Sequence, residues 1–201
     1  MITLLAIDTA APRLQLALRH QGAVDTSVED MAQGQAELIL PRIEALLARN
    51  GVAFADLGRI AVTTGPGSFT GLRIGLSAAR GLGLALGIPV IGVPSLLAIS
   101  LSAPPGVPAV VLLDARRDEA YFQRFAGPGH SSDQPRLLPM AEARGRVAAG
   151  ATLIESPFVD IARLAAFAAH ADPAHYPPDA AYVRDADAKP QEKFRVARVA
   201  S

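Results

Sequence analysis

The sequence predicts an α/β chain (with α+β halves) built from two related halves, and two observations carry this prediction. Before residue 102, short apolar or alternating runs typical of strands are followed by segments with a helical period, in the order β-β-β-α-β-α-β-α. The stretch 102–108, which holds three prolines and a glycine, then reads as a linker. After it, a shorter and strand-rich half begins with a hairpin.

The first half opens with three expected strands. Residues 3–9 form a short apolar run, and residues 14–19 alternate leucine with other residues at the strand period. Residues 23–29 can run back after the turn His20-Gln21-Gly22. We therefore expect a β-meander at the start of the chain.

Helices and strands are then expected to alternate. Gln35–Asn50 carries apolar residues on one helical stripe, holds Pro41 near its first turns and is followed by Gly51 as a stop. A second helix is expected from a Thr70 cap to Leu86. The remaining expected elements are strands over 59–64 and 89–93 and a short helix over 95–101.

The second half is less regular. Residues 107–114 and 119–125 are expected to form a hairpin around the tight turn 115–118, and residues 160–170 a short amphipathic helix. The remaining segments are a polar, turn-rich stretch over 127–138, a strand or loop over 180–184, and a loose tail over 185–193.

Composition excludes several classes of protein. Nineteen basic residues balance nineteen acidic ones, which disfavours binding to nucleic acid by bulk charge. The absence of cysteine excludes disulfides, zinc–thiolate sites and a cysteine nucleophile, and the four histidines form no HxxxH pair. The first residues lack the basic region of a signal peptide, and no apolar run of about 18 residues could span a membrane. We expect a soluble, cytoplasmic protein.

The segment 64–75, TGPGSFTGLRIG, follows one expected strand and opens the second helix. Backbone amides at such a place can face an anion, which makes Gly65, Gly67 and Ser68 candidate nucleotide or phosphate contacts. The segment lacks the lysine of a Walker A loop and does not match GxGxxG in register. The alternative is that the glycines only permit a tight turn between strand and helix.

Asp8 and Thr9 stand at the end of the first expected strand. An aspartate beside a hydroxyl at this place could hold a magnesium–phosphate complex. The alternative, which we favour because no second acidic partner is visible, is that Asp8 caps the turn by accepting from nearby backbone amides.

The second helix carries only two charges, Arg73 and Arg80, and is apolar on both sides. Such a helix is expected to be buried on both sides, and its small residues would let another helix approach closely. The second covering surface is expected from another subunit, with the C-terminal half as the alternative.

The hairpin 114–121 looks at first like a charged active-site cluster. A solvated tip at Arg116 and Arg117 is the default reading, and contact with an acidic partner or with tRNA phosphate is the alternative.

These motifs together resemble a known family. The segments that carry the resemblance are LLAIDTA (4–10), VTTGPGSFTGLRIG (62–75), ARGL (79–82), GIPV (87–90), GVPSL (92–96) and DARRDEAY (114–121). The chain resembles the TsaB (YeaZ) family of bacterial tRNA threonylcarbamoyladenosine biosynthesis subunits, densely over residues 1–125 and thinly afterwards. It departs from the family at Gln35-Ala36-Glu37, where His-Ser-Glu is frequent, and in trimmed loops after Gly129.

The resemblance implies an actin/Hsp70/sugar-kinase-like (ASKHA) fold of two RNase H-like subdomains, residues 1–103 and 104–201. It also implies a non-catalytic scaffold that binds the paralogue TsaD, together with the ATPase TsaE, in threonylcarbamoyl transfer to adenosine 37 of tRNA. The two N-terminal helices would pair with TsaD, or with a second copy of the chain when TsaD is absent. The residues expected to contact the partner are Leu38, Arg42, Leu72, Gly75, Leu76 and Ala79.

The same resemblance implies no intrinsic cofactor or metal, with ATP and metal on TsaD and TsaE and tRNA met through the complex. The alternative function is a nucleotide-dependent kinase or ATPase of the same fold, in which Asp8 holds magnesium and Gly65–Gly71 holds phosphate. A peptidase is a weaker option, because no nucleophile–base pair or metal triad can be named from the sequence.

Overall fold

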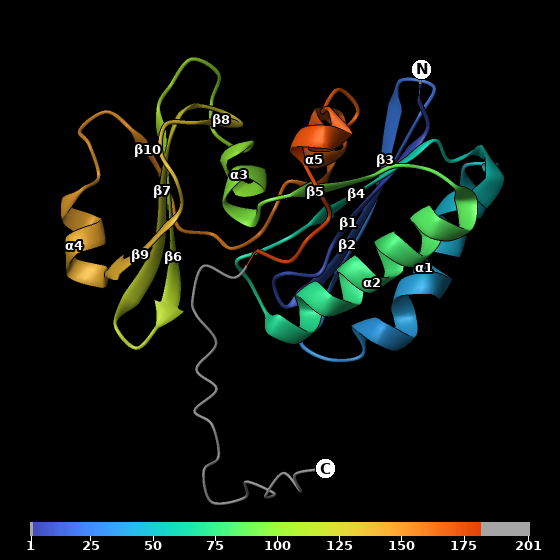
Figure 1. Cartoon of the computed structure of the whole chain (residues 1–201), viewed down its shortest axis with the longest axis horizontal. Coiled ribbons are helices and arrows are strands. Elements are labelled where there is room, and N and C mark those ends of the chain that lie inside the picture. Colours follow the sequence, from blue (N-terminus) through green and yellow to red (C-terminus); the bar gives the residue numbers. More distant parts are fainter. Residues whose placement is uncertain (1, 182–201) are drawn as a thin grey trace, which may run out of the picture.

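The computed structural model describes residues 2–181 and contains two mixed, five-stranded sheets (Figure 1). The strands of the first sheet are β1 (Leu4–Asp8), β2 (Arg13–His20), β3 (Ala23–Asp30), β4 (Arg59–Thr63) and β5 (Val90–Val93). Their order in the sheet is β3-β2-β1-β4-β5, with β1, β2 and β3 antiparallel and β1, β4 and β5 parallel. The expected N-terminal meander is therefore confirmed.

The second sheet is smaller and less regular. Its strands are β6 (Ala109–Arg116), β7 (Glu119–Gly127), β8 (His130–Ser131), β9 (Arg136–Pro139) and β10 (Thr152–Ile154). The predicted hairpin is the antiparallel pair β6–β7, and β10 adds to β6 in parallel. The expected turn-rich stretch contains two short strands, β8 and β9, both of which pair with β7.

Five α-helices complete the described chain. They are α1 (Gln35–Arg49), α2 (Phe69–Leu86), α3 (Ser95–Ser100), α4 (Met140–Gly145) and α5 (Ile161–Ala168). The α2 helix begins two residues earlier than a Thr70 cap predicts, because Ser68 is its N-cap and accepts from Gly71 N at 3.2 Å. It ends at Gly87, whose φ of 67° is the left-handed conformation that suits glycine. At α3 the N-cap is Pro94, and the Ser95 hydroxyl is used elsewhere.

These elements stack in five layers (Figure 1). The α1 and α2 helices cover one face of the first sheet, and α3 and α5 lie between the two sheets. The α4 helix covers the outer face of the second sheet. Each strand near the middle of a sheet is thus buried on both faces, which explains the continuous apolar run Leu-Leu-Ala-Ile in β1.

The two faces of β1 supply two different cores. Leu4 and Ala6 pack in the middle layer with α3 and α5, whereas Leu5 and Ile7 pack under α1 and α2. The period of two along the strand sends alternate side chains to opposite faces.

The α5 helix follows the second sheet in the chain but packs on the first. The Arg59 guanidinium of β4 donates to the carbonyls of Ala168 and Ala171 at 2.8 Å each, which holds the C-terminal end of α5 against the first sheet. Because α5 lies on the face of that sheet opposite α2, it leaves the outer side of α2 uncovered.

Some expectations concern the chain between the two sheets and the C-terminal segment. The predicted boundary at 103/104 falls in the turn-rich segment between α3 and β6 and stays a prediction. The tail over 185–193 and most of the segment 180–184 lie outside the described residues. Within the described part of the chain, no helix has the length and apolar character needed to cross a bilayer.

Candidate functional site

The glycine loop between β4 and α2 packs directly on the chain that follows β1. A Cβ atom at Gly67 would lie 2.7 Å from the carbonyl oxygen of Ala10, and one at Gly71 would lie 2.0 Å from that of Thr9. No real side chain tolerates these distances, so glycine is required here by close approach of two backbone segments. This supports the reading in which the glycines permit a tight strand-to-helix turn.

Two amides of the loop that were expected to face an anion are occupied within the protein. Gly65 N donates to the Ser95 hydroxyl at 3.1 Å, and Ser68 N donates to the carbonyl of Ala10 at 2.7 Å. The Ser68 hydroxyl caps α2. These two amides thus hold the loop against α3 and the residues after β1, and are not available to bind an anion.

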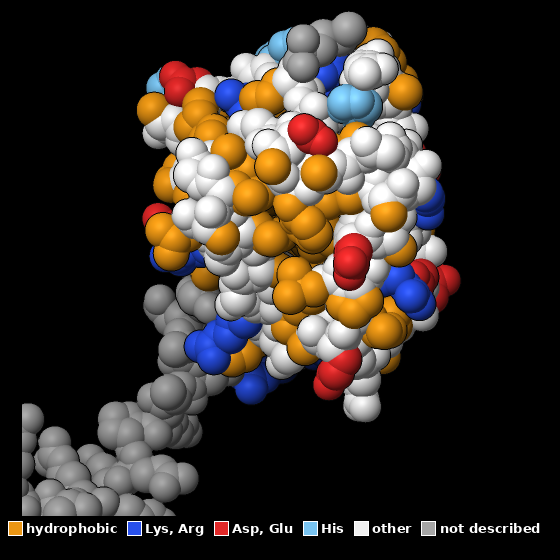
Figure 2. All heavy atoms as spheres, turned by 90° about the vertical axis from the view of Figure 1, so that its right-hand side faces the viewer, with side chains coloured by type: hydrophobic (Ala, Val, Ile, Leu, Met, Phe, Trp, Pro, Cys, Tyr) orange, Lys and Arg blue, Asp and Glu red, His pale blue; other side chains and the backbone are white. Residues whose placement is uncertain are grey.

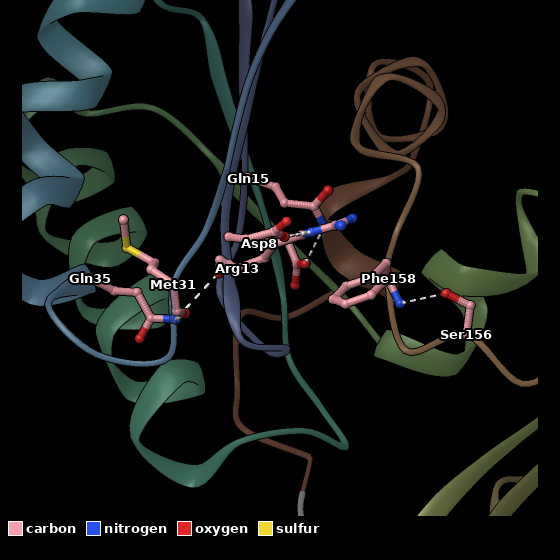
Figure 3. A network of polar contacts seen from close by, with 8 residues as sticks. Asp8, Arg13, Gln15, Met31, Gln35, Ser156 and Phe158 are labelled. Carbon is pink, nitrogen blue, oxygen red and sulfur yellow. Dashed lines mark hydrogen bonds and ion pairs between the residues drawn. The ribbon is translucent and has the colours of Figure 1, made fainter.

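Asp8 is completely buried at the end of β1 (Figure 3). One carboxylate oxygen accepts from the Thr63 hydroxyl at 2.6 Å and from Ala10 N at 3.1 Å, and the other accepts from Gln15 Nε2 at 2.9 Å. Burial raises the pKa of Asp8, and these hydrogen bonds oppose the shift. Both oxygens serve the protein itself, so the favoured reading, Asp8 as a turn cap, is the one that the geometry supports.

Thr9 is also buried, and its hydroxyl donates to the carbonyl of Gly71 at 2.7 Å. The end of β1 is therefore joined to the first turn of α2 by a side-chain bond as well as by backbone contact.

A cleft of about 430 Å³ lies between the two halves of the chain. Pro66, Gly67 and Ser68 line one wall, and Asp114 and Arg116 line the other. Asp8 and Thr9 do not line it. Asp8 and the glycine loop therefore do not share this cleft, whereas the kinase alternative expects both to face one nucleotide.

Metal binding by a cluster of side chains finds no support in residues 2–181. No group of three or more His, Asp or Glu side chains comes together there in a way that could hold an ion.

Four of the six predicted contact residues face inward, which corrects their assignment. Leu72, Gly75, Leu76 and Ala79 are buried between α2 and the first sheet, and a Cβ at Gly75 would lie 2.5 Å from the Thr9 hydroxyl. The small residues of α2 that the sequence offered for a partner helix are the ones that let α2 approach its own sheet.

The other two predicted contact residues lie on α1 and are half-buried. Leu38 packs against the core beneath α1 and α2. Arg42 forms an ion pair with Glu29 of β3, in which Nη2 lies 3.1 Å from Oε2, and this pairing raises its pKa. Both therefore serve the packing of α1 on the sheet.

On the side of α1 and α2 that no other part of residues 2–181 covers lies a shallow groove of about 570 Å³, which we call the outer helix groove. Figure 2 shows hydrophobic side chains gathered around a hollow on this face of the molecule. Its lining residues are Ala36, Ile39, Leu40, Phe69, Thr70, Arg73, Ile74, Ser77 and Ala78. Large apolar side chains are exposed here and along α2, including Leu40 (51%), Phe69 (55%) and Leu84 (87%).

The sequence predicted a partner on the outer side of α2 but assigned the wrong residues to that side, although a signal was present. Gly75, Ala79 and Gly83 recur every four residues and mark the side that meets the sheet. Phe69 and Leu84, which lie away from that stripe, are then largely exposed in the described chain.

Gln35, at the position where the resembled family often has histidine, has a structural role (Figure 3). Its buried amide donates to the carbonyls of Arg13 and Met31 at 3.3 and 3.4 Å, which ties the start of α1 to the first sheet. The Arg13 guanidinium lies over the Phe158 ring, 3.7 Å from its centroid.

The β6–β7 hairpin has an exposed tip. Arg116, Arg117 and Asp118 have φ values of 63°, 56° and 60°, and the Asp114 carboxylate accepts from Arg116 N at 2.7 Å. The solvated turn is the observed arrangement, and a contact with tRNA stays a prediction.

Comparison with known proteins points to one family. The family model described as TsaD, tRNA N6-adenosine threonylcarbamoyltransferase, matches residues 29–136, which is more than half of the chain. A tRNA threonylcarbamoyladenosine biosynthesis protein TsaB from Escherichia coli is 36% identical over 125 residues, covering 61% of this chain and 54% of that protein. The TsaB protein of Haemophilus influenzae is 35% identical over 136 residues, covering 66% and 57% respectively. The chain thus spans little more than half the length of these relatives.

Solved structures agree over nearly the whole length. A Pseudomonas aeruginosa protein described as similar to the peptidase YeaZ superposes with a TM-score of 0.78 at 27% identity, over 92% of this chain and all of that one. YeaZ from the same organism gives 0.74 at 25% identity, over 90% of this chain and all of that one. The ASKHA fold expected from the resemblance is confirmed. The chain therefore belongs to the family described as TsaD, tRNA N6-adenosine threonylcarbamoyltransferase, and within it to the TsaB (YeaZ) proteins.

Proposed function

We propose that the chain is a non-catalytic subunit of tRNA threonylcarbamoyladenosine biosynthesis that binds and activates TsaD through the outer helix groove. The observation that carries this proposal is the exposed apolar face of α1 and α2. Contiguous apolar surface of this kind marks an interaction site in an otherwise water-facing protein. Two of the relatives bear a name that places them in the pathway.

The outward side of α2 also suits a close helix–helix contact. Ser77, Ala78, Gly81 and Ala85 are small and lie at or near the surface, and a Cβ at Gly81 would meet no atom within 4 Å. A partner helix can therefore approach the α2 backbone. A specific complex would bury about 800 Å² on each side.

Catalysis is assigned to the partners in this proposal. ATP and metal would bind to TsaD and TsaE, and tRNA would be met through the complex. The buried carboxylate of Asp8 supports the assignment of ATP and metal to the partners, because both of its oxygens accept hydrogen bonds inside the chain. In the absence of TsaD, a second copy of the chain would occupy the same face. The site of action would be the cytoplasm.

The test is light scattering after size-exclusion chromatography, on the chain alone and mixed with TsaD from the same organism. We expect a stable one-to-one complex and a higher rate of threonylcarbamoyl transfer when the chain, TsaE and ATP are added to TsaD. A mixture that shows neither complex nor stimulation would overturn the proposal. Titration with ATP–Mg would then examine the kinase alternative directly.

A matched pair of variants assigns the surface. Ala78→Glu places a long charged side chain in the groove and is expected to weaken the complex by on the order of 100-fold, because it blocks the close approach of a partner helix and brings a charge into an apolar contact. Ala45→Glu is the control: it is exposed on α1, five residues after Leu40 and so about 140° around the helix from it. Equal affinities for the two variants would contradict the assignment.

A further inference from the structure

One residue of the outer helix groove differs from the others in kind. Of the nine described residues that line it, Arg73 alone is charged. It is exposed, and its guanidinium carbon lies 3.9 Å from the centroid of the Phe69 ring, one turn earlier on α2. The ring holds the cation at the mouth of an apolar groove.

The other arginines of α1 and α2 all have a carboxylate partner. Arg42 pairs with Glu29, Arg49 with Asp25 and Arg80 with Asp179. In the described part of the chain, no carboxylate lies within 4.0 Å of the Arg73 guanidinium. The cation that faces the groove is thus the one arginine of α1 and α2 without a carboxylate partner among residues 2–181.

We propose that Arg73 determines which partner the groove accepts, and that it receives a carboxylate from an otherwise apolar helix of that partner. The inference rests on the proposed function, under which the helix belongs to TsaD. A planar guanidinium binds a carboxylate through two parallel hydrogen bonds. Stacking on Phe69 restricts the arginine before the partner arrives, so less side-chain freedom is lost on binding.

Charge complementarity favours this occupant over two others. A second copy of the chain that docked groove to groove would bring another Arg73 and no acidic lining residue. The segment 182–201 carries five Lys or Arg and three Asp or Glu, so its net charge has the same sign as Arg73. Only a partner with its own acidic residue satisfies the cation in a site that excludes water.

The test is the affinity of the full-length chain for TsaD, measured by titration calorimetry at low and high salt. Arg73→Gln is expected to weaken binding by on the order of 30-fold and to reduce its salt dependence, because the charge pair is lost. Arg73→Lys keeps the charge without the planar fork and is expected to lose less. Thermal melting of each variant alone should match the wild type, since the side chain is exposed.

Arg80→Gln is the control for a change in net charge on the same helix. Arg80 does not line the groove and already has Asp179 at 3.9 Å, so a loss below about twofold is expected. A charge reversal would identify the partner carboxylate. Arg73→Glu is expected to weaken binding, and changing the matching Asp or Glu of TsaD to Lys is expected to restore it.

The outcomes separate the two proposals. If wild-type chain binds TsaD but Arg73→Gln binds equally well, the specificity role of Arg73 is wrong and the proposed function stands. If the Arg73 variants alter only self-association of the chain, the occupant is a second copy and the inference fails. If wild-type chain does not bind TsaD at all, the proposed function fails, and this inference fails with it.

Discussion

Gly71 is the residue at which α2 comes nearest to β1. A methyl group there would lie 2.0 Å from the Thr9 carbonyl oxygen, whereas a methyl at Gly81 on the same helix would meet no atom within 4 Å. The same substitution should therefore have opposite effects at the two positions.

We predict that Gly71→Ala lowers the free energy of unfolding by about 3 kcal/mol, because two backbone segments must separate. Gly81→Ala should raise it by about 0.5–1 kcal/mol, since alanine is the better helix former at an exposed position. Urea denaturation of the two variants and the wild type measures both effects. A similar loss in both variants would mean that helix propensity, rather than contact with Thr9, decides the result.

Gly75 shows why single residues of the site were assigned wrongly from sequence. A glycine among small residues fits a partner helix and a sheet equally well. Which of the two Gly75 contacts depends on which side of α2 packs against β1, and this is decided by tertiary packing rather than by local sequence. Because a Cβ at Gly75 would lie 2.5 Å from the Thr9 hydroxyl, a bulky variant there would disturb the fold and could not report on partner binding.

At the scale of elements, α1 is fastened to β3 by ion pairs across the edge of the first sheet. Arg49 Nε lies 2.6 Å from Asp25 Oδ2 and Nη2 lies 2.8 Å from Oδ1, and Asn50 Nδ2 lies 2.7 Å from Oδ2. Hydrogen bonds from Arg49 and then Asn50 lower the pKa of Asp25 to about 2. The α1 helix, which forms one wall of the groove, is thus held in part by the titratable carboxylate of Asp25.

We predict that Asp25→Asn lowers stability by about 0.5–1 kcal/mol at neutral pH, a modest value because the side chain is 37% exposed. The folded pKa is depressed, so the wild-type advantage is fully present above the ordinary value of 3.8 and is lost as the pH falls toward 2. Urea denaturation at a series of pH values measures the difference.

Asp30→Asn, on the same strand at a carboxylate that is 75% exposed, serves as the control. If the loss in free energy of unfolding caused by Asp25→Asn stays constant between pH 5 and about pH 2, the assigned role of the Asp25 carboxylate is wrong.

Elements with a strong period could be predicted from the sequence. β1, β2, α1 and α2 each bury a regular pattern of side chains, so their positions were right to within a few residues. The α4 helix and β10 were missed because they have six and three residues, and β10 exists through its parallel pairing with β6. Such short elements are fixed by tertiary contact rather than by local pattern.

At the scale of the whole molecule, the path of α5 decides what remains exposed. The helix returns from the second half to cover the inner face of the first sheet, held in part by Arg59. No local pattern in the sequence predicts this long-range contact. The sequence therefore left open whether the C-terminal half covers the outer side of α2. With α5 in the middle layer, the outer helix groove stays uncovered in residues 2–181.

Hydrogen–deuterium exchange of the full-length chain with and without TsaD tests the central claim most directly. We predict that TsaD slows exchange in 36–40 and 69–81, the segments that form the groove and the outward side of α2, and leaves the cleft walls 113–116 and 155–159 unchanged. Protection confined to the cleft or to the β6–β7 hairpin, with none on α1 and α2, would contradict the account.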